Sequence, residues 1–245
     1  MIVYEFPLNE HVRTLLKLER LFQQVLYLAR QQDPLLHQTA LFGIFDLFEL
    51  GSRNEMRSEL QMELTRLRQR TDGAVVSPGN ESSVDFIDQA LAALQAMPAR
   101  LDQPLRDCDW LAGVRQRANI PGGVNGFDLP QFHYWQHMSP AQRKADLVNW
   151  ISPMLPLHQA LSLLLKRIRE NGAPKALLAP HGYYQQALNG RSSHMLRIGL
   201  PVDSQTIPEA SANRHAINIR FLNAGKGLPA RCEQDIEFQL CFCQL

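Results

Sequence analysis

The 245-residue chain lacks a large excess of charge of either sign. It has 25 lysines and arginines against 24 aspartates and glutamates, so its formal net charge at pH 7 is +1 with histidine neutral. A protein that is drawn to nucleic acid by its overall field is usually far more basic. Any function that depends on charge must therefore come from local clusters of side chains.

Long hydrophobic runs are also missing. The most apolar stretch, residues 155–165, is interrupted by Pro156, His158 and Gln159, whereas a membrane-spanning helix needs about 20 consecutive apolar residues. The first ten residues, MIVYEFPLNE, have no basic start and include a proline and two acidic residues, which is unlike a secretory signal peptide. We therefore expect a cytoplasmic protein without a membrane span.

Cysteine is scarce, and its spacing does not suggest a metal site. The four cysteines are Cys108, Cys232, Cys241 and Cys243. Without a secretory signal they are expected to be reduced thiols. The pair Cys241-x-Cys243 has no matching Cys or His pair at zinc-finger spacing. We therefore expect neither a metal nor a cofactor.

Recognisable catalytic motifs are absent as well. The sequence contains no Gly-x-Ser-x-Gly, and no Ser, Cys or His stands in a known nucleophile context. Pairs of acidic residues occur, for example Glu55 with Glu59 and Asp107 with Asp109, but on charged helices or at helix starts, where capping accounts for them. The sequence gives no reason to expect an enzyme.

Most of the chain has a helical pattern. From Asn9 to about Gly172 apolar residues recur at helical spacing, and capping residues and prolines mark the helix starts. The start signals are Asn9, Asp33-Pro34, the capping box Ser52-x-x-Glu55, Asp128 with Pro130, and the capping box Ser139-Pro140-x-Gln142.

From about Tyr183 the pattern alternates with a period of two. Apolar and polar residues alternate over 196–202, 217–221 and 236–242, which is typical of half-buried antiparallel strands. Helices followed by strands predict an α+β fold rather than a wound parallel sheet. We expect a mainly helical domain over residues 1–178 and an antiparallel β domain over residues 179–245 that packs on the helices.

The segment IPGGVNGFDLP, residues 120–130, contains three glycines and two prolines. A phosphate cradle would require a strand, a glycine turn and a helix N-terminus in the spacing of known nucleotide-binding motifs, and neither motif occurs. The glycines follow a helical segment instead. We interpret the segment as a bend between two helices.

Cationic and aromatic residues flank this bend. Arg115 and Arg117 precede it, and His133 and His137 follow it on one face of the next helix. A metal site is not favoured, because the glutamate of His-Glu-x-x-His and a third ligand are missing. With the neighbouring Tyr134 and Trp135, these residues favour a partner-binding surface.

Two further sets of cations share a face. Arg13, Lys17 and Arg20 form a stripe on the first helix, and Arg214 and Arg220 lie on one face of a late strand. A simply solvated face would explain the helix stripe. If the sheet packs against the helices, both sets could instead line one site for an acidic partner.

Three stretches resemble the ZapD family of bacterial cell-division proteins. They are EFPLNEHVRTLLKLERLFQQ at 5–24, VRQRANIPGGVNGFDLPQFHYWQH at 114–137 and AINIRFL at 216–222. The resemblance runs from near residue 4 to the C-terminus, and the string around the glycines is too long to arise from composition.

The resemblance implies an adaptor rather than an enzyme. Such proteins are cytoplasmic homodimers that bind the C-terminal tail of FtsZ, a tubulin-like GTPase, cross-link its protofilaments and support the Z-ring at midcell. The implied tail-binding residues are Arg13, Lys17, Arg115, Arg117, His137 and Arg220, with Arg20 and Arg214 extending the stripes. From the residues alone, a nucleic-acid-binding or small-anion-binding protein that uses the same arginines stays open, although the balanced charge counts against nucleic acid.

Overall fold

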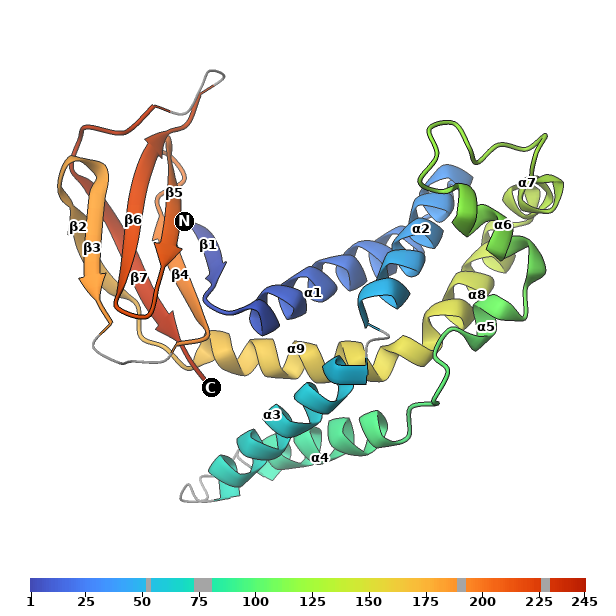
Figure 1. The fold of residues 1–245 in the computed structure, drawn as a ribbon, viewed down its shortest axis with the longest axis horizontal. Coiled ribbons are helices and arrows are strands. Elements are labelled where there is room, and N and C mark those ends of the chain that lie inside the picture. Colours follow the sequence, from blue (N-terminus) through green and yellow to red (C-terminus); the bar gives the residue numbers. More distant parts are fainter. Residues whose placement is uncertain (52–53, 73–80, 189–192, 226–229) are drawn as a thin grey trace. The chain divides into compact units, whose positions relative to one another are not determined.

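The structure, a computed structural model, describes residues 1–51, 54–72, 81–188, 193–225 and 230–245 (Figure 1). The chain forms two compact units, which we call the strand unit (Met1–Thr14 with Leu165–Leu245) and the helical unit (Leu15–Leu164). The boundary between the units falls inside the first and last long helices. The expected division into a helical domain of residues 1–178 and a β domain of residues 179–245 stays a prediction.

The helical unit begins within α1 and ends within α9. Its elements are α1 (Glu10–Leu28), α2 (Pro34–Gly51), α3 (Asn54–Asp72), α4 (Glu81–Gln95), α5 (Gln103–Arg106), α6 (Asp109–Arg117), α7 (Pro130–His137), α8 (Pro140–Ile151), the 3-10 turn η1 (Ser152–Met154) and α9 (Leu155–Glu170).

Helix starts follow the capping signals in three places. Asn9 Oδ1 accepts a hydrogen bond from the Val12 amide at 2.8 Å, and Asp33 Oδ1 accepts one from the Leu35 amide at 2.7 Å. Ser139 forms the complete capping box with Gln142. These three predictions are confirmed, since each side chain satisfies an amide that the first helical turn leaves without a partner.

Two other start signals have different outcomes. Ser52 of the expected box Ser52-x-x-Glu55 lies outside the described residues. Asp128 does not cap α7, whose N-cap is Leu129 without a side-chain hydrogen bond. The Asp128 carboxylate instead accepts from Asn125 in the preceding loop and pairs with Arg117, the last residue of α6. The helix start expected at Asp128 with Pro130 is confirmed, since α7 begins at Pro130, but Asp128 is not its cap.

The core of the helical unit forms where α1, α2 and α9 pack together. The α1 residues Leu15, Leu18 and Phe22 are fully buried, and burial of a side chain of this size contributes about 1.5–3 kcal/mol. A Cβ atom at Gly43 of α2 would lie 2.6 Å from Val25 Cγ2. The helices can therefore approach this closely only with glycine at that position.

A buried arginine holds α2, α7 and α8 together. Arg143 of α8 donates from Nε to His37 Nδ1 at 3.1 Å and from its terminal nitrogens to the Gln136 and Gln32 carbonyls at 3.0 and 2.6 Å. It also donates to the carbonyl of Met138. Because these acceptors come from two segments far apart in the sequence, residues 32–37 and 136–138, one side chain fixes how α7 and α8 are placed.

The strand unit contains two antiparallel sheets. Its elements are β1 (Ile2–Pro7), β2 (Lys175–Ala179), the 3-10 turn η2 (Pro180–Gly182), β3 (Tyr183–Ala187), β4 (Met195–Leu200), β5 (Thr206–Ala212), β6 (Ala216–Asn223) and β7 (Ile236–Cys243). One sheet has the order β1-β4-β7-β2 and the other β3-β6-β5.

The two sheets share one core. Ile198 of β4, Ile219 of β6 and Leu240 of β7 belong to a single buried cluster. The rings of Phe221 and Phe238, one from each sheet, lie 5.0 Å apart. The alternation in the sequence therefore placed most buried residues of β4, β6 and β7 correctly, and the α+β class is confirmed. It was wrong at Val202, which lies beyond the end of β4 and has an exposed fraction of 69%.

Four strands, β1, β2, β3 and β5, lie outside the three alternating ranges, and all four are at sheet edges. β1 and β2 are the edges of the four-stranded sheet, and β3 and β5 are those of the three-stranded sheet. In β1, Ile2 pairs with Leu200, a residue far away in the sequence. The residues around Ile2 therefore do not indicate which strand β1 pairs with. β5 contains Pro208, which is tolerated in an edge strand because the missing N–H can face away from the sheet.

Candidate functional site: three cationic surfaces

The site residues expected from the sequence lie on three surfaces. The helix stripe consists of Arg13, Lys17 and Arg20 on α1; the loop surface consists of Arg115, Arg117 and His137 around residues 118–129; and the sheet face consists of Arg214 and Arg220 in and before β6. Within each surface the residues come from one or two adjacent elements. That the three surfaces form one groove stays a prediction.

The three cations of the helix stripe are exposed, on the side of α1 away from its buried residues. Arg13 Nε lies 3.1 Å from Glu10 Oε1, one turn earlier on the same helix. Within the described part of the chain, Lys17 and Arg20 have no salt-bridge partner. Both cations are therefore available to an acidic ligand.

The loop between α6 and α7 is held by its own residues. Asn125 accepts from the Asp128 amide at 2.9 Å and donates to the Gly122 carbonyl at 3.2 Å. Gly122 has φ +67°, which favours glycine. A Cβ atom at Gly126 would lie 2.6 Å from the ring of His133. The glycines serve the turn and the close approach, in agreement with the interpretation as a bend.

The two arginines before the loop have different environments. Arg117 forms an ion pair with Asp128 at 3.1 Å, which ties the end of α6 to the loop. Arg115 is exposed and has no salt-bridge partner among the described residues. Since residues two apart on a helix point in different directions, Arg115 is the better candidate for contact with a ligand.

Apolar side chains accompany the charges of the loop surface. The exposed fractions are 87% for Phe127, 71% for Tyr134 and 56% for Ile120. His137 is exposed too, and its Nδ1 lies 2.8 Å from the His133 carbonyl. Sequence analysis did not single out Ile120 and Phe127. A signal was available in the sequence. Apolar residues in a short Gly- and Pro-rich loop do not belong to the buried face of a helix or strand, so they are expected to be exposed.

The sheet face is the outer side of the sheet β3-β6-β5. The buried side of β6 carries Ile217, Ile219 and Phe221, so Arg220 points outward, and it is exposed. In the register of the sheet, Arg220 lies between Tyr183 of β3 and Glu209 of β5.

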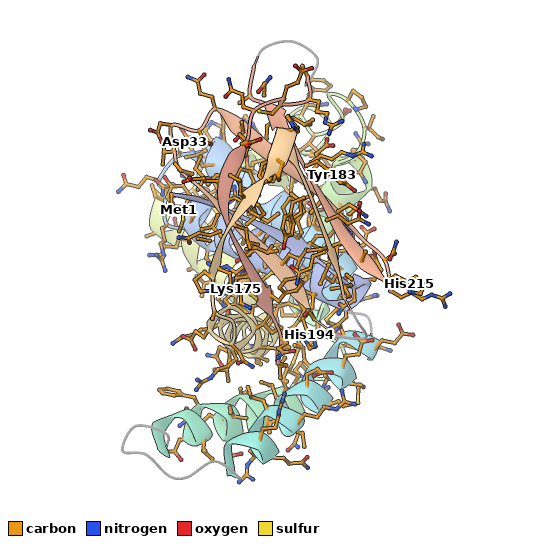
Figure 2. The ribbon with its side chains drawn as sticks, turned by 90° about the vertical axis from the view of Figure 1, so that its left-hand side faces the viewer. Met1, Asp33, Lys175, Tyr183, His194 and His215 are labelled. Carbon is orange, nitrogen blue, oxygen red and sulfur yellow. The ribbon has the colours of Figure 1, made fainter. Side chains whose placement is uncertain are left out.

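The sheet face extends beyond Arg220. Tyr183 donates a hydrogen bond from its hydroxyl to Asn218 Oδ1 at 2.8 Å. Arg214 precedes β6 and donates from Nε to the ring of His215 at 2.9 Å. Figure 2 labels Tyr183, which pairs with Arg220, and His215, which follows Arg214 in the sequence. The face is polar and cationic with one carboxylate.

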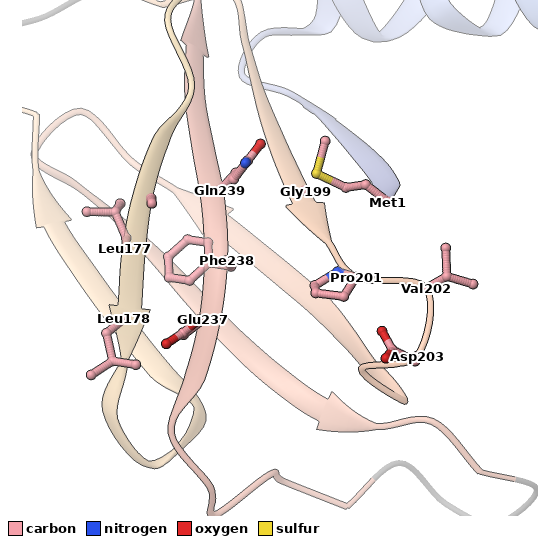
Figure 3. Close-up of a pocket in the computed structure, with 11 residues that line it drawn as sticks. Met1, Leu177, Leu178, Gly199, Pro201, Val202, Asp203, Glu237, Phe238 and Gln239 are labelled. Atoms are coloured by element: carbon pink, nitrogen blue, oxygen red, sulfur yellow. The ribbon is translucent and has the colours of Figure 1, made fainter.

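A wide pocket on the four-stranded sheet is lined by acidic residues, in contrast to the three cationic surfaces. It has a volume of about 850 Å³ and is lined by Leu178, Val202 and Phe238 and by the carboxylates of Asp203 and Glu237 (Figure 3). Two carboxylates repel an acidic ligand. This hollow of the strand unit is therefore not a site for an acidic partner.

Metal and thiol chemistry have little support in the geometry. No group of three or more His, Cys, Asp or Glu residues able to hold a metal occurs among the described residues. Cys241 and Cys243 are buried with their sulfur atoms 3.6 Å apart. Burial, together with the neighbouring Cys241, raises the pKa of Cys243 to about 12, so this thiol remains protonated and is a poor nucleophile.

Comparison with known proteins identifies the class of protein. The family model described as "ZapD: Cell division protein" matches residues 16–220. Proteins named "Cell division protein ZapD" from Dechloromonas aromatica, Azoarcus sp. and Aromatoleum aromaticum are 41%, 40% and 38% identical to this chain. Each match covers the whole chain and 98–100% of the relative.

The chain is therefore a cell-division protein. It belongs to the ZapD family, which the sequence motifs had already indicated, and this is not a known enzyme family. No helix among the described residues combines the length and apolar character needed to cross a membrane. The segment matched by the family model contains every expected site residue except Arg13, which only the full-length relatives cover.

Proposed function

We propose that this protein binds the acidic C-terminal tail of FtsZ through its cationic surfaces and, as a homodimer, cross-links FtsZ protofilaments to stabilise the Z-ring at midcell. The observation that carries the proposal is the set of exposed cations without salt-bridge partners among the described residues, namely Lys17, Arg20, Arg115, Arg214 and Arg220. Lys17, Arg115 and Arg220 lie in the motifs by which the chain resembles the family, and Arg20 and Arg214 extend the stripes.

The chemistry of the surfaces suits a short acidic peptide with apolar residues. Guanidinium groups form charge-assisted hydrogen bonds with carboxylates, and Arg115 and Arg220 are free to do so. Phe127 and Tyr134 offer exposed rings to apolar side chains of the same peptide. A flexible tail loses conformational entropy on binding, so a single site is expected to be weak, with a Kd of about 1–100 μM.

Two sites in one dimer would compensate for weak single contacts. A second tail on the same filament binds at the high effective concentration set by the first, so avidity exceeds the single-site affinity by about two to four orders of magnitude. Bundling then needs no nucleotide and no metal. The family and the absence of a catalytic motif in the sequence agree with a role as adaptor.

Charge reversal tests the proposal. Arg115→Glu and Arg220→Glu are expected to abolish co-sedimentation with FtsZ polymers while circular dichroism and solution mass are unchanged. The matched controls are Arg100→Glu, an exposed arginine between α4 and α5, and Lys175→Glu on the other sheet. If both reversals bundle FtsZ like the wild type, the cationic surfaces do not bind the tail.

A second experiment tests whether the FtsZ tail is the ligand. A synthetic FtsZ tail peptide should compete with bundling, and FtsZ without its tail should not be bundled. Bundling of tail-deleted FtsZ at the wild-type level would refute tail capture. A gel shift with DNA and RNA at physiological salt tests the alternative use of the same arginines, and no shift is expected.

A further inference from the structure

A pocket of about 520 Å³ opens in the helical unit beside α6, α7 and α8. Its wall includes all three tryptophans of the chain, Trp110, Trp135 and Trp150, together with Tyr134 and Asp146. Pockets that bind small molecules have volumes of about 300–1,000 Å³. The hollow is large enough for a small organic ligand. Of the side chains proposed to contact the tail, Tyr134 lines it and none of the cations does.

The aromatic rings of this pocket form a cluster. The centroid distances are 5.9 Å between Trp110 and Trp135, 5.8 Å between Trp110 and Trp150, and 5.7 Å between Trp135 and Trp150. Trp135 and Trp150 are buried, whereas Tyr134 has an exposed fraction of 71%. The buried indoles thus form the inner part of the wall, and Tyr134 is its solvent-exposed part.

Asp146 contributes a charge that no cation balances. One of its oxygens accepts a hydrogen bond from Trp135 Nε1 at 3.0 Å, and the carboxylate has no salt-bridge partner among the described residues. Its charge acts within the pocket: burial first, and then the nearby Asp146 carboxylate, raise the pKa of the Cys108 thiol. An aromatic wall with an uncompensated, half-buried carboxylate favours a positive ligand.

We propose that this pocket binds a small organic cation with an alkylated ammonium head. The faces of indole and phenol rings attract cations, most strongly where water is excluded, and Asp146 adds a direct attraction. An alkylated ammonium also gives up its weak hydration easily, whereas the compact ammonium of lysine is strongly hydrated. The site shares Tyr134 with the loop surface proposed to bind the tail, and its ligand has the opposite charge to the tail.

Intrinsic fluorescence provides a direct test, because every tryptophan of the chain lines this pocket. Choline chloride should change the emission saturably at constant ionic strength. The neutral isostere 3,3-dimethylbutan-1-ol has the same shape without the charge and should bind at least about tenfold more weakly. No saturable change with choline, or equal binding of the two compounds, would overturn the proposal.

A variant and its control test the contribution of the Asp146 charge. Asp146→Asn keeps an acceptor for Trp135 Nε1 and removes the charge, so choline binding should fall at least about fivefold. Glu49→Gln, an exposed acid on α2, is the control and should leave binding unchanged. Isothermal titration calorimetry repeats the measurement without relying on the indoles. Unchanged choline binding by Asp146→Asn would contradict the proposal.

The exposed ring gives an independent variant that does not disturb the core. Tyr134→Leu should weaken choline binding at least about threefold, whereas Tyr27→Leu, an equally exposed tyrosine on α1, should not. Nα-acetyl-lysine amide serves as the primary-ammonium probe. Tighter binding of this probe than of choline would overturn the assignment to an alkylated ammonium.

Discussion

Arg143 is a buried cation whose hydrogen bonds all go to uncharged groups. Its Nε donates to His37 Nδ1, and His37 Nε2 lies 2.7 Å from the Gln31 carbonyl. Since arginine has no acceptor, Nδ1 must be unprotonated and Nε2 must carry the hydrogen. The pair therefore requires a neutral His37, and a single imidazole tautomer connects α8 with the start of α2.

Replacement of Arg143 by methionine should strongly destabilise the fold. The change removes the donor from three part-buried hydrogen bonds, to the carbonyls of Gln32, Gln136 and Met138, and from the buried one to His37. We expect a loss of about 3–5 kcal/mol in the free energy of unfolding, measured by urea denaturation. Arg100→Met, at an exposed position, is the control and should change stability by less than about 0.5 kcal/mol. A loss below about 1 kcal/mol in Arg143→Met would contradict the role given to this network.

The same network predicts how stability depends on pH. Burial, and to a smaller extent the Arg143 charge, lower the pKa of His37, and burial lowers the pKa of His158. The unfolded chain therefore binds more protons than the folded one below about pH 6.5. Stability should fall from pH 7.5 to pH 5.5, by at most about 1.4 kcal/mol per pH unit for each histidine.

Urea denaturation at each pH checks this prediction. His37→Gln should reduce the slope of stability against pH, and the double change with His158→Gln should nearly remove it. Asp46 acts with the opposite sign: burial raises the pKa of this carboxyl, so the folded chain holds its proton more tightly and stability gains as the pH falls. An unchanged slope in the double variant would show that other groups control the pH dependence.

At the level of elements, the sequence predicted helix starts, which depend on nearby residues, but not strand pairing, which depends on distant ones. Asn9, Asp33 and Ser139 mark helix starts through bonds within a few residues, so the sequence alone predicts them. β1 depends on pairing with β4 almost 200 residues later, and no local pattern contains that pairing. Exposure of Arg220 followed from strand alternation, but its neighbours Tyr183 and Glu209 became known only from the register.

The loop between α6 and α7 should be sensitive at one glycine. Gly122 has φ +67° and nothing within 4 Å of an added Cβ, so alanine there introduces backbone strain alone. We expect Gly122→Ala to cost about 1–2 kcal/mol in thermal or urea unfolding. Gly225→Ala also meets open space, but without a left-handed φ, and should cost nearly nothing. Equal effects of the two changes would show that the left-handed backbone at Gly122 is not the cause.

The register of the three-stranded sheet predicts a gain in affinity. Glu209 lies opposite Arg220 on the outer face and should compete with, and repel, an acidic ligand. Glu209→Gln should therefore strengthen binding of the FtsZ tail peptide about two- to fivefold in fluorescence anisotropy. Glu237→Gln on the other sheet should have no effect. Unchanged or weaker binding by Glu209→Gln would remove the sheet face from the proposed site.

For the whole molecule, the sequence supplied the family and the list of cations but not their assembly. Arg13, Lys17 and Arg20 follow from helix period and Arg220 from strand period. Arg214 was wrongly expected in the same strand as Arg220, since it lies in the turn between β5 and β6. A common groove depends on how separate units meet. Periodicity describes one element at a time and carries no information on such placement. Double-mutant cycles with the tail peptide, for example Lys17→Ala with Arg220→Ala, measure whether two surfaces hold the same ligand, since only then is their coupling nonzero.

Valency and charge together predict how bundling responds to salt. If exposed arginines pair with tail carboxylates, screening weakens each contact as the Debye length falls from about 14 Å at 0.05 M to about 6 Å at 0.3 M. Because cross-linking needs both sites of a dimer, FtsZ bundling measured by light scattering should fall more steeply with salt than binding of a single tail peptide. FtsZ polymerisation without this protein at each salt concentration is the control. Bundling that is independent of salt, while the peptide still competes, would show that apolar contacts at Phe127 and Tyr134 carry the interaction instead.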